Sequence, residues 1–297
     1  INAMAYNERT GLVDEYGGID DINNKVIRCV GRPEERFTED ALRMMRAIRF
    51  SAQLGFTIED NTYKAIEKLS ANIQKVSMER VCVELKKTLM SDNPDFCRLY
   101  GTTNLFKDIL PQLHDSFTKR QSKRILLTCK YSEKELPLRL TACLSNGTPA
   151  QAEDTLRHLR MDNKTIETVV KILTFSKDNI EETEPAIREA LHKCGRDIFE
   201  LVIKYDFAFV KASEEVTFIS NPARYNHLVT LKRMADEILS RGDCFTIKDL
   251  DITGLDLIEY GLKGTQIGST LNYLLDIVIE NPKLNDKATL IGLLDMK

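Results

Sequence analysis

The sequence lacks three features that would place it in common protein classes. No apolar run reaches the roughly 18 residues of a transmembrane helix, so we predict no membrane span. None of the seven cysteines forms a C-x-x-C pair, which argues against a zinc site or a disulfide framework and favours reduced thiols in the cytoplasm. None of the four histidines lies at ligand spacing from another, so we predict no metal site in this chain.

Charge is abundant and unevenly distributed. Charged residues make up 29% of the 297 residues and apolar residues 42%, as in a globular protein of two or more domains. The net charge of −3 does not indicate a nucleic-acid binder, but an approaching phosphate responds to the local charge. Residues 116–132 carry five basic side chains and no acid. A solvated helix face is one interpretation of this stretch; the other is RNA binding by Lys119, Arg120, Lys123 and Arg124.

Residues 1–31 have a β pattern that the rest of the chain lacks. A short strand in GLVDEY, a Gly-Gly turn and a polar turn precede a β-branched strand at residues 26–30. Two short strands make a poor sheet alone, and the sequence shows no obvious partners for them. Because the chain starts at Ile1, we expect either a fragment whose remaining sheet lies upstream or a cloning remnant before Met4.

The pattern from Thr38 onward is helical. Thr38 is the expected N-cap of a helix with Glu39 and Asp40 in its first turn, where the helix dipole favours acids. Gly55 is expected to end that helix. Further helices are predicted at residues 57–73, 77–90 and, after a boundary at 91–95, through most of the remaining chain. The predicted fold is therefore mainly α.

Asp40 and Arg43 are neighbours at i, i+3 in the expected helix. Taken alone, such a surface ion pair contributes only about 0–1 kcal/mol. A carboxylate accepts hydrogen bonds and a guanidinium donates them, and cytosine and adenine both present an amino donor beside a ring-nitrogen acceptor. The pair could thus accept C and A and leave unpaired groups against G and U. Arg46 and Arg49 follow at three-residue spacing and could hold phosphate or brace the pair.

Several segments together resemble one known family, the bacterial-type CCA-adding tRNA nucleotidyltransferases and the related poly(A) polymerases. The resemblance runs through the first 90 residues and returns near the C-terminus. The segments that carry it are INAMAYN, GLVDEYGGIDDI, VIRCVGRPEERFTEDALRMMRAIRFSAQLGF, MERVCVELKKTL and DITGLDLIEYGLKGTQIGSTLNYLLDIVIENPKLN.

This resemblance implies an elongated protein with a catalytic head and a helical neck, body and tail. It places a small β remnant of the head at residues 1–31, the neck at 32–91, a degenerate body at 92–210 and a tRNA-binding tail at 211–297. It also implies addition of C, C and A to tRNA 3′ ends from CTP and ATP, with Mg²⁺ in the complete enzyme. Poly(A) polymerases and relatives that add only A or only CC remain open.

The family's base-reading motif, Glu-Asp-x-x-Arg, matches Glu39, Asp40 and Arg43. The resemblance therefore assigns protein templating to Asp40 and Arg43. It makes Asn2 the last part of a nucleotide-contacting segment of the head. The stretch Asp14 to Asp20 matches the hinge between head and neck.

Two departures from the family pattern affect the expected activity. The chain contains no Gly-Ser-x-x-x-x-Asp-x-Asp segment, whose carboxylates would hold Mg²⁺. We therefore expect this chain to read a base and bind tRNA without joining the nucleotide. Ser145 and Asn146 stand where a metal-dependent body would have a His-Asp pair, and His114 is expected to be a surface or capping residue.

The tail contains Gly261, Gly264 and Gly268 around an expected helix start, with Lys263 between them. Bare amides and a lysine can hold phosphate, but a C-cap and a turn explain the glycines equally well. The resemblance favours RNA contact at Lys263. A non-catalytic helical RNA-binding module remains the alternative from another class, and the sequence does not give the oligomeric state.

Overall fold

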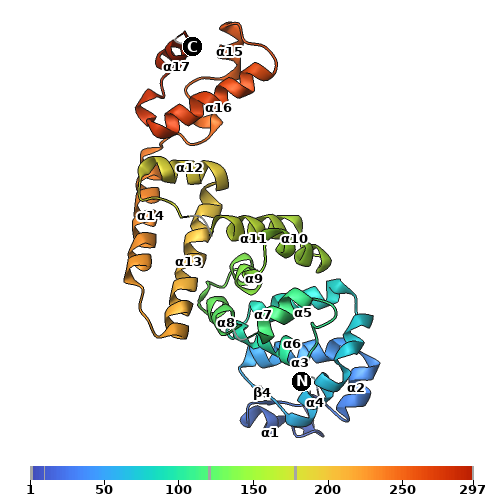
Figure 1. Ribbon diagram of the computed structural model, residues 1–297. Helices are drawn as coiled ribbons and strands as arrows, with labels where there is room; N and C mark the ends of the chain where they lie inside the picture. Colours follow the sequence, from blue (N-terminus) through green and yellow to red (C-terminus); the bar gives the residue numbers. More distant parts are fainter. Residues whose placement is uncertain (1–2, 10, 120–121, 177–178, 296–297) are drawn as a thin grey trace. The chain divides into compact units, whose positions relative to one another are not determined.

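A computed structural model describes residues 3–9, 11–119, 122–176 and 179–295 (Figure 1). Seventeen α-helices and four short strands form among these residues, which confirms the predicted mainly α fold. The chain divides into two compact units, Ile1–Ser176 with Lys204–Ser220, and Lys177–Ile203 with Asn221–Lys297. The finer division into head remnant, neck, body and tail stays a prediction. None of the described helices is long and apolar enough to cross a membrane.

The first unit contains most of the secondary structure. Its elements are β1 (Met4–Asn7), β2 (Gly11–Asp14), α1 (Gly18–Asn23), β3 (Val26–Ile27), α2 (Pro33–Glu39), α3 (Leu42–Leu54), β4 (Thr57–Ile58), α4 (Asp60–Leu69), α5 (Met78–Leu89), α6 (Arg98–Thr102), α7 (Pro111–Thr118), α8 (Ser122–Tyr131), α9 (Leu136–Leu144), α10 (Pro149–His158) and α11 (Asn163–Phe175). Two 3-10 helices, Ser70–Lys75 and Pro94–Cys97, connect α4 to α5 and α5 to α6.

The second unit is built from fewer helices. They are α12 (Glu184–Cys194), α14 (Pro222–Arg241), α15 (Gly254–Glu259), α16 (Thr265–Glu280) and α17 (Lys287–Asp295). Helix α13 (Arg196–Thr217) begins in this unit and continues in the first. The core of the α15–α17 region consists of Cys244, Leu250, Ile252, Leu257, Leu274, Leu275, Val278, Ile279 and Leu290.

Both strands expected near the N-terminus find partners that the sequence did not reveal. β1 pairs with β2 in an antiparallel ribbon, and β3 pairs in parallel with β4, about thirty residues later in the chain. The polar turn expected after the Gly-Gly pair is the short helix α1. The Asp14 carboxylate accepts the N–H groups of Gly18 and Ile19 at 2.7 and 2.8 Å. These hydrogen bonds hold the start of α1 and lower the pKa of Asp14.

The segment expected to form one helix from Thr38 forms two helices. Helix α2 starts with Pro33, whose missing N–H and fixed φ suit a first helical position, and it ends at Glu39. Asp40 then takes an extended conformation with φ −146° and ψ 102°. Helix α3 begins at Leu42. The prediction of Thr38 as an N-cap is therefore wrong, because Thr38 lies in the last turn of α2.

The helix expected at residues 57–73 begins later, because β4 occupies its first two residues. Helix α4 starts at Asp60, and the Glu59 carboxylate caps it by accepting the N–H of Thr62 at 2.8 Å. The predicted end of the preceding helix is confirmed. Gly55 follows α3 in the left-handed conformation, with φ 68°, which costs a glycine little.

Helices α3 and α5 pack against each other and form the part of the core next to the site. Burial of each large apolar side chain contributes about 1.5–3 kcal/mol relative to exposure. This packing fixes one face of α3 and leaves its other face available to line a pocket. The fully buried side chains of the two helices include Met44, Met45, Ile48, Val81, Leu85 and Leu89.

Candidate nucleotide-binding site

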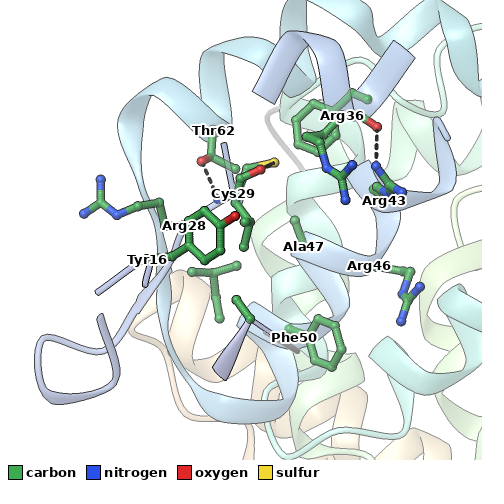
Figure 2. Close-up of a pocket in the computed structure, with 13 residues that line it drawn as sticks. Tyr16, Arg28, Cys29, Arg36, Arg43, Arg46, Ala47, Phe50 and Thr62 are labelled. Carbon is green, nitrogen blue, oxygen red and sulfur yellow. Dashed lines mark hydrogen bonds between the residues drawn. The ribbon is translucent and has the colours of Figure 1, made fainter. Parts of the chain in front are cut away.

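A pocket of about 430 Å³ lies in the first unit, between α2, α3, α4 and the residues that follow β3 (Figure 2). This volume is within the range of small-molecule sites. Part of its wall is apolar and can cover the faces of a planar ring. The apolar and aromatic lining residues are Ala3, Tyr16, Ile27, Val30, Phe37, Ala47 and Phe50.

Three guanidinium groups, of Arg36, Arg43 and Arg46, line the pocket from α2 and α3. One oxygen of Glu39, Oε2, accepts hydrogen bonds from Nη1 of Arg36 at 2.8 Å and from Nη1 of Arg43 at 2.7 Å. Nη1 of Arg43 also donates to the main-chain carbonyl of Arg36 at 3.1 Å (Figure 2). Arg46 has no ion-pair or hydrogen-bond partner among the described residues. Three cations balanced by one carboxylate favour an anionic ligand.

The sequence predicted that Asp40 and Arg43 lie beside each other on one helix, but in the structure they do not share a helix. Asp40 forms the break after α2, Arg43 lies in the first turn of α3, and no side-chain hydrogen bond joins them among the described residues. The Asp40 carboxylate instead accepts the N–H of Leu42 at 3.1 Å through Oδ1. Its Oδ2 accepts from Nη2 of Arg80, on α5, at 3.2 Å. No local sequence pattern predicts this contact, because forty residues separate its partners.

Arg49 lies outside the lining of the pocket. Its side chain is 10% exposed, and its Nε lies 3.2 Å from Oε2 of Glu84 between α3 and α5. Its guanidinium carbon is also 4.0 Å from the ring centroid of Phe50, which does line the pocket. Arg49 therefore lies behind the wall of the pocket and not in its lining, and its role in nucleotide binding stays a prediction. Asn2 lies outside the described residues.

The wall opposite the arginines is held by α4. The N–H of Cys29 donates to Oγ1 of Thr62 at 3.0 Å (Figure 2), and Oγ1 of Thr62 donates to the Glu59 carboxylate at 2.8 Å. Arg28 also lines the pocket, but its guanidinium points away from the other arginines and pairs with Asp21 at 3.1 Å. Partial burial raises the pKa of the Cys29 thiol. Cys29 is the only one of the seven cysteines that is not buried.

The described residues do not offer a fit for Mg²⁺. They contain no group of three or more His, Cys, Asp or Glu side chains that could hold a metal ion. The acids next to the pocket, Glu39 and Asp40, are already paired with arginines. His114 lies partly buried in α7, and its Nδ1 has no hydrogen-bond partner among the described residues.

Several candidate RNA-binding side chains already make contacts within the chain. Lys119 pairs with Asp115 at 2.7 Å. Lys123 and Arg124, on α8, lie over the rings of Phe218 and Phe209, at 6.0 and 5.0 Å from the ring centroids. Arg120 lies outside the described residues. Lys263 is exposed in the connection between α15 and α16, where Gly261 and Gly264 have positive φ.

Comparison with known proteins decides the family. Residues 129–294 match the family model described as "tRNA nucleotidyltransferase domain 2 putative". The CCA-adding enzyme of Pediococcus pentosaceus is 30% identical over 305 residues, which cover 98% of this chain and 69% of that enzyme. This chain belongs to the CCA-adding tRNA nucleotidyltransferase family. The predicted resemblance and the enzyme class, nucleotidyltransferase, are thereby confirmed.

Other comparisons agree with this assignment of the chain to the nucleotidyltransferase family. Residues 55–117 match the model "Probable RNA and SrmB- binding site of polymerase A". The CCA-adding enzyme of Ligilactobacillus salivarius is 30% identical over 98% of this chain and 68% of that enzyme. The CCA-adding enzyme of Leuconostoc mesenteroides is 53% identical over 90 residues, 30% of this chain. The Bacillus stearothermophilus CCA-adding enzyme in complex with CTP has the same fold, with a TM-score of 0.75 at 24% identity over 99% of this chain and 72% of that one.

Proposed function

We propose that this pocket selects the base of CTP or ATP for addition to the 3′ end of tRNA. The observation that carries the proposal is the position of Arg43 in a cationic pocket, in a chain of the CCA-adding family. Arg46, which has no partner among the described residues, supplies a cation for phosphate. Because the proposed substrate is tRNA, we expect the protein to act in the cytoplasm.

Base selection follows from the donors and acceptors at the break between α2 and α3. Arg43 offers a donor from the pocket lining, and the Asp40 carboxylate, at the break and outside that lining, offers an acceptor. Each carboxylate oxygen can accept about two hydrogen bonds, so the bonds from Leu42 and Arg80 leave acceptor sites for a base. C and A match this pattern. G and U would leave Arg43 and Asp40 unpaired in the complex, although a bound base would cover both side chains, which are 33% and 31% exposed in the free chain.

The division of work within the reaction is part of the proposal. Two-metal phosphoryl transfer uses Mg²⁺ to activate the attacking hydroxyl and stabilise the leaving phosphate. The described residues do not fit such a site, so we assign this chain no step through the metal. Its own residues bind the base, orient it and contact tRNA. Addition of C, C and A, of A alone, of CC or of poly(A) would all use the same pocket.

A second candidate function is RNA binding without turnover. The match of residues 55–117 to an RNA-binding model favours it. The basic side chains of α8 supply charge for contacts with phosphate. Incorporation of labelled CTP and ATP into tRNA that lacks its CCA end, measured beside tRNA binding, separates the two functions.

Protection of Cys29 from alkylation tests the pocket directly. Cys29 lines the pocket and is the only cysteine that is not buried, so a bound nucleotide should shield it. We expect CTP and ATP at ten times their Kd to slow alkylation about 10-fold, and UTP and GTP at the same concentrations to slow it much less. Because the pKa of Cys29 is raised, the reaction is followed at about pH 8.5, where more thiolate is present.

The control for this experiment lies in the same samples. Mass spectrometry of the peptides measures labelling at Cys29 and at a buried thiol such as Cys82, which should stay unlabelled in every sample. Equal protection by all four nucleotides would remove base selection from the proposal. No protection by any of them would show that nucleotides bind elsewhere.

Lys263→Glu is expected to weaken tRNA binding and to lower the salt dependence of the affinity by about one phosphate contact. Lys263 is exposed beside the start of α16, and the positive end of the helix dipole also favours an anion there. The measurement is the tRNA Kd at several salt concentrations. Lys232→Glu, on α14, is the matched control because it makes the same charge change at an exposed lysine. Equal effects of the two substitutions would leave only a general electrostatic role for Lys263.

A further inference from the structure

Arg36 makes two separate contacts that reach the base-reading residues. Its Nη1 donates to Oε2 of Glu39 at 2.8 Å. Its main-chain carbonyl, in the last turns of α2, accepts from Nη1 of Arg43 at 3.1 Å (Figure 2). Arg36 therefore connects the end of α2 to the first turn of α3, across the break at Asp40.

These contacts determine which donors of Arg43 remain available. Nη1 of a guanidinium carries two hydrogens. One bonds Oε2 of Glu39 and the other bonds the carbonyl of Arg36. Both hydrogens of Nη1 are thus used within the protein, and the Nε and Nη2 donors remain for a ligand. The edge of Arg43 that a base can meet is consequently set by Glu39 and Arg36.

Glu39 would hold Arg43 weakly without Arg36. The Glu39 side chain is 53% exposed and Arg43 is 33% exposed, and an exposed i, i+4 pair contributes only about 0.3–0.5 kcal/mol. Arg36 shares the same carboxylate oxygen, which limits the rotamers that Glu39 can adopt. The carbonyl of Arg36 belongs to the helix backbone and gives Arg43 a rigid second acceptor.

We infer that Arg36 is a positioning residue for base selection, which orients Arg43 through Glu39 and through its own carbonyl. This inference rests on the proposed function of the pocket. It assigns Arg36 a role different from that of Arg46, whose guanidinium has no partner among the described residues. A phosphate contact would strengthen binding of all four nucleoside triphosphates equally. A positioning contact changes the ratio between them.

The test measures the Kd of CTP, ATP, UTP and GTP for the full chain and for Arg36→Gln, Glu39→Gln and the double variant. We expect Arg36→Gln to lower the ratio of the UTP and CTP Kd values by about 3- to 10-fold, the size of coupling between residues in contact. The double variant should lower this ratio no more than Glu39→Gln alone does. Arg36→Lys, which can still bond Glu39, should restore part of the ratio.

Arg32→Gln is the matched control. Arg32 precedes α2 and pairs with Glu35 at 3.1 Å with the same i, i+3 spacing, but it is 83% exposed and does not line the pocket. Its substitution should leave all four Kd values unchanged. Equal weakening of all four nucleotides by Arg36→Gln, or additive losses in the double variant, would overturn the positioning role. If the unmodified chain itself shows no preference for CTP and ATP, the proposed function fails first, and the inference fails with it.

Discussion

Arg43→Ala is expected to reduce the preference for CTP over UTP, and for ATP over GTP, by about 10- to 100-fold, because a hydrogen bond from a charged donor contributes roughly 1.5–3 kcal/mol. The substitution removes the donors that face the pocket. It leaves Glu39 paired with Arg36, so the end of α2 keeps its ion pair and the variant should fold. The ratios of the four Kd values measure the effect.

Two companion variants separate selection from general affinity. Arg46→Ala, one turn along α3, should weaken binding of all four nucleotides to a similar degree, because a phosphate contact does not depend on the base. Arg43→Lys keeps the charge but loses the planar group of donors, so it should not restore the ratio fully. An unchanged preference for C and A in Arg43→Ala would refute the role of Arg43 as a template.

The parts of the fold that depend on local signals could be predicted from the sequence. Helical periodicity gave the mainly α class, and Gly55 ended α3 as expected because glycine adopts the left-handed conformation readily. Arg43 and Arg46 could be chosen as site residues because they follow one another at three-residue spacing and so share a helix face. The structure brings both to one pocket.

The features that the sequence did not reveal depend on contacts between distant segments. Asp40 leaves the helical conformation, and its carboxylate is held by Arg80 from α5. Periodicity counts positions along one helix and cannot detect such a break. The same limit applies to Arg49, which has the spacing of a site residue but lies between α3 and α5 beside Glu84. The pairing of β3 with β4 is also non-local.

Arg36 was not among the site residues predicted from the sequence, because its role depends on two contacts of different kinds. Its pairing with Glu39 at i, i+3 is an ordinary helix pattern that alone indicates little. Its main-chain contact with Arg43 spans the break where α2 ends at Glu39 and α3 begins at Leu42. Both contacts become informative once the break between the helices is known.

The second unit contains a buried guanidinium whose removal should have a large effect on stability. Arg188, on α12, has a side chain that is only 2% exposed. Its Nη1 lies 3.0 Å from the carboxylate of Asp243, whose side chain is 8% exposed, and 3.0 Å from that of Glu184. Its Nε donates to the carbonyl of Ile279 at 2.7 Å and its Nη2 to that of Glu280 at 3.4 Å. These carbonyls end α16 and have no partner within that helix.

Arg188→Ala is expected to lower the free energy of unfolding of the second unit by about 3–5 kcal/mol, the usual cost of removing one partner of a buried ion pair. The variant leaves two carbonyls of α16 and part of the Asp243 carboxylate without a donor. Denaturant titration followed by labelling of Cys244 measures this unit, because Cys244 is buried in its core. Labelling of Cys143, buried in α9 of the first unit, provides an internal control that should not change.

The dependence on pH tests whether the paired carboxylates, of Asp243 and Glu184, carry this effect. Hydrogen bonds from Arg241 and Arg188 hold the pKa of Asp243 below its ordinary value of 3.8 despite partial burial. A carboxyl group with a lowered pKa in the folded state stabilises the fold above the unfolded pKa, and this stabilisation is lost as the pH falls through the folded pKa. The difference in the free energy of unfolding between Arg188→Ala and the unmodified chain should therefore narrow below about pH 4.

Arg233→Ala is the control variant. It removes an exposed i, i+4 pair on α14 and should change the free energy of unfolding by only about 0.5 kcal/mol at any pH. A similarly small effect of Arg188→Ala would show that Arg241, which also contacts Asp243 at 2.9 Å, is sufficient to hold it.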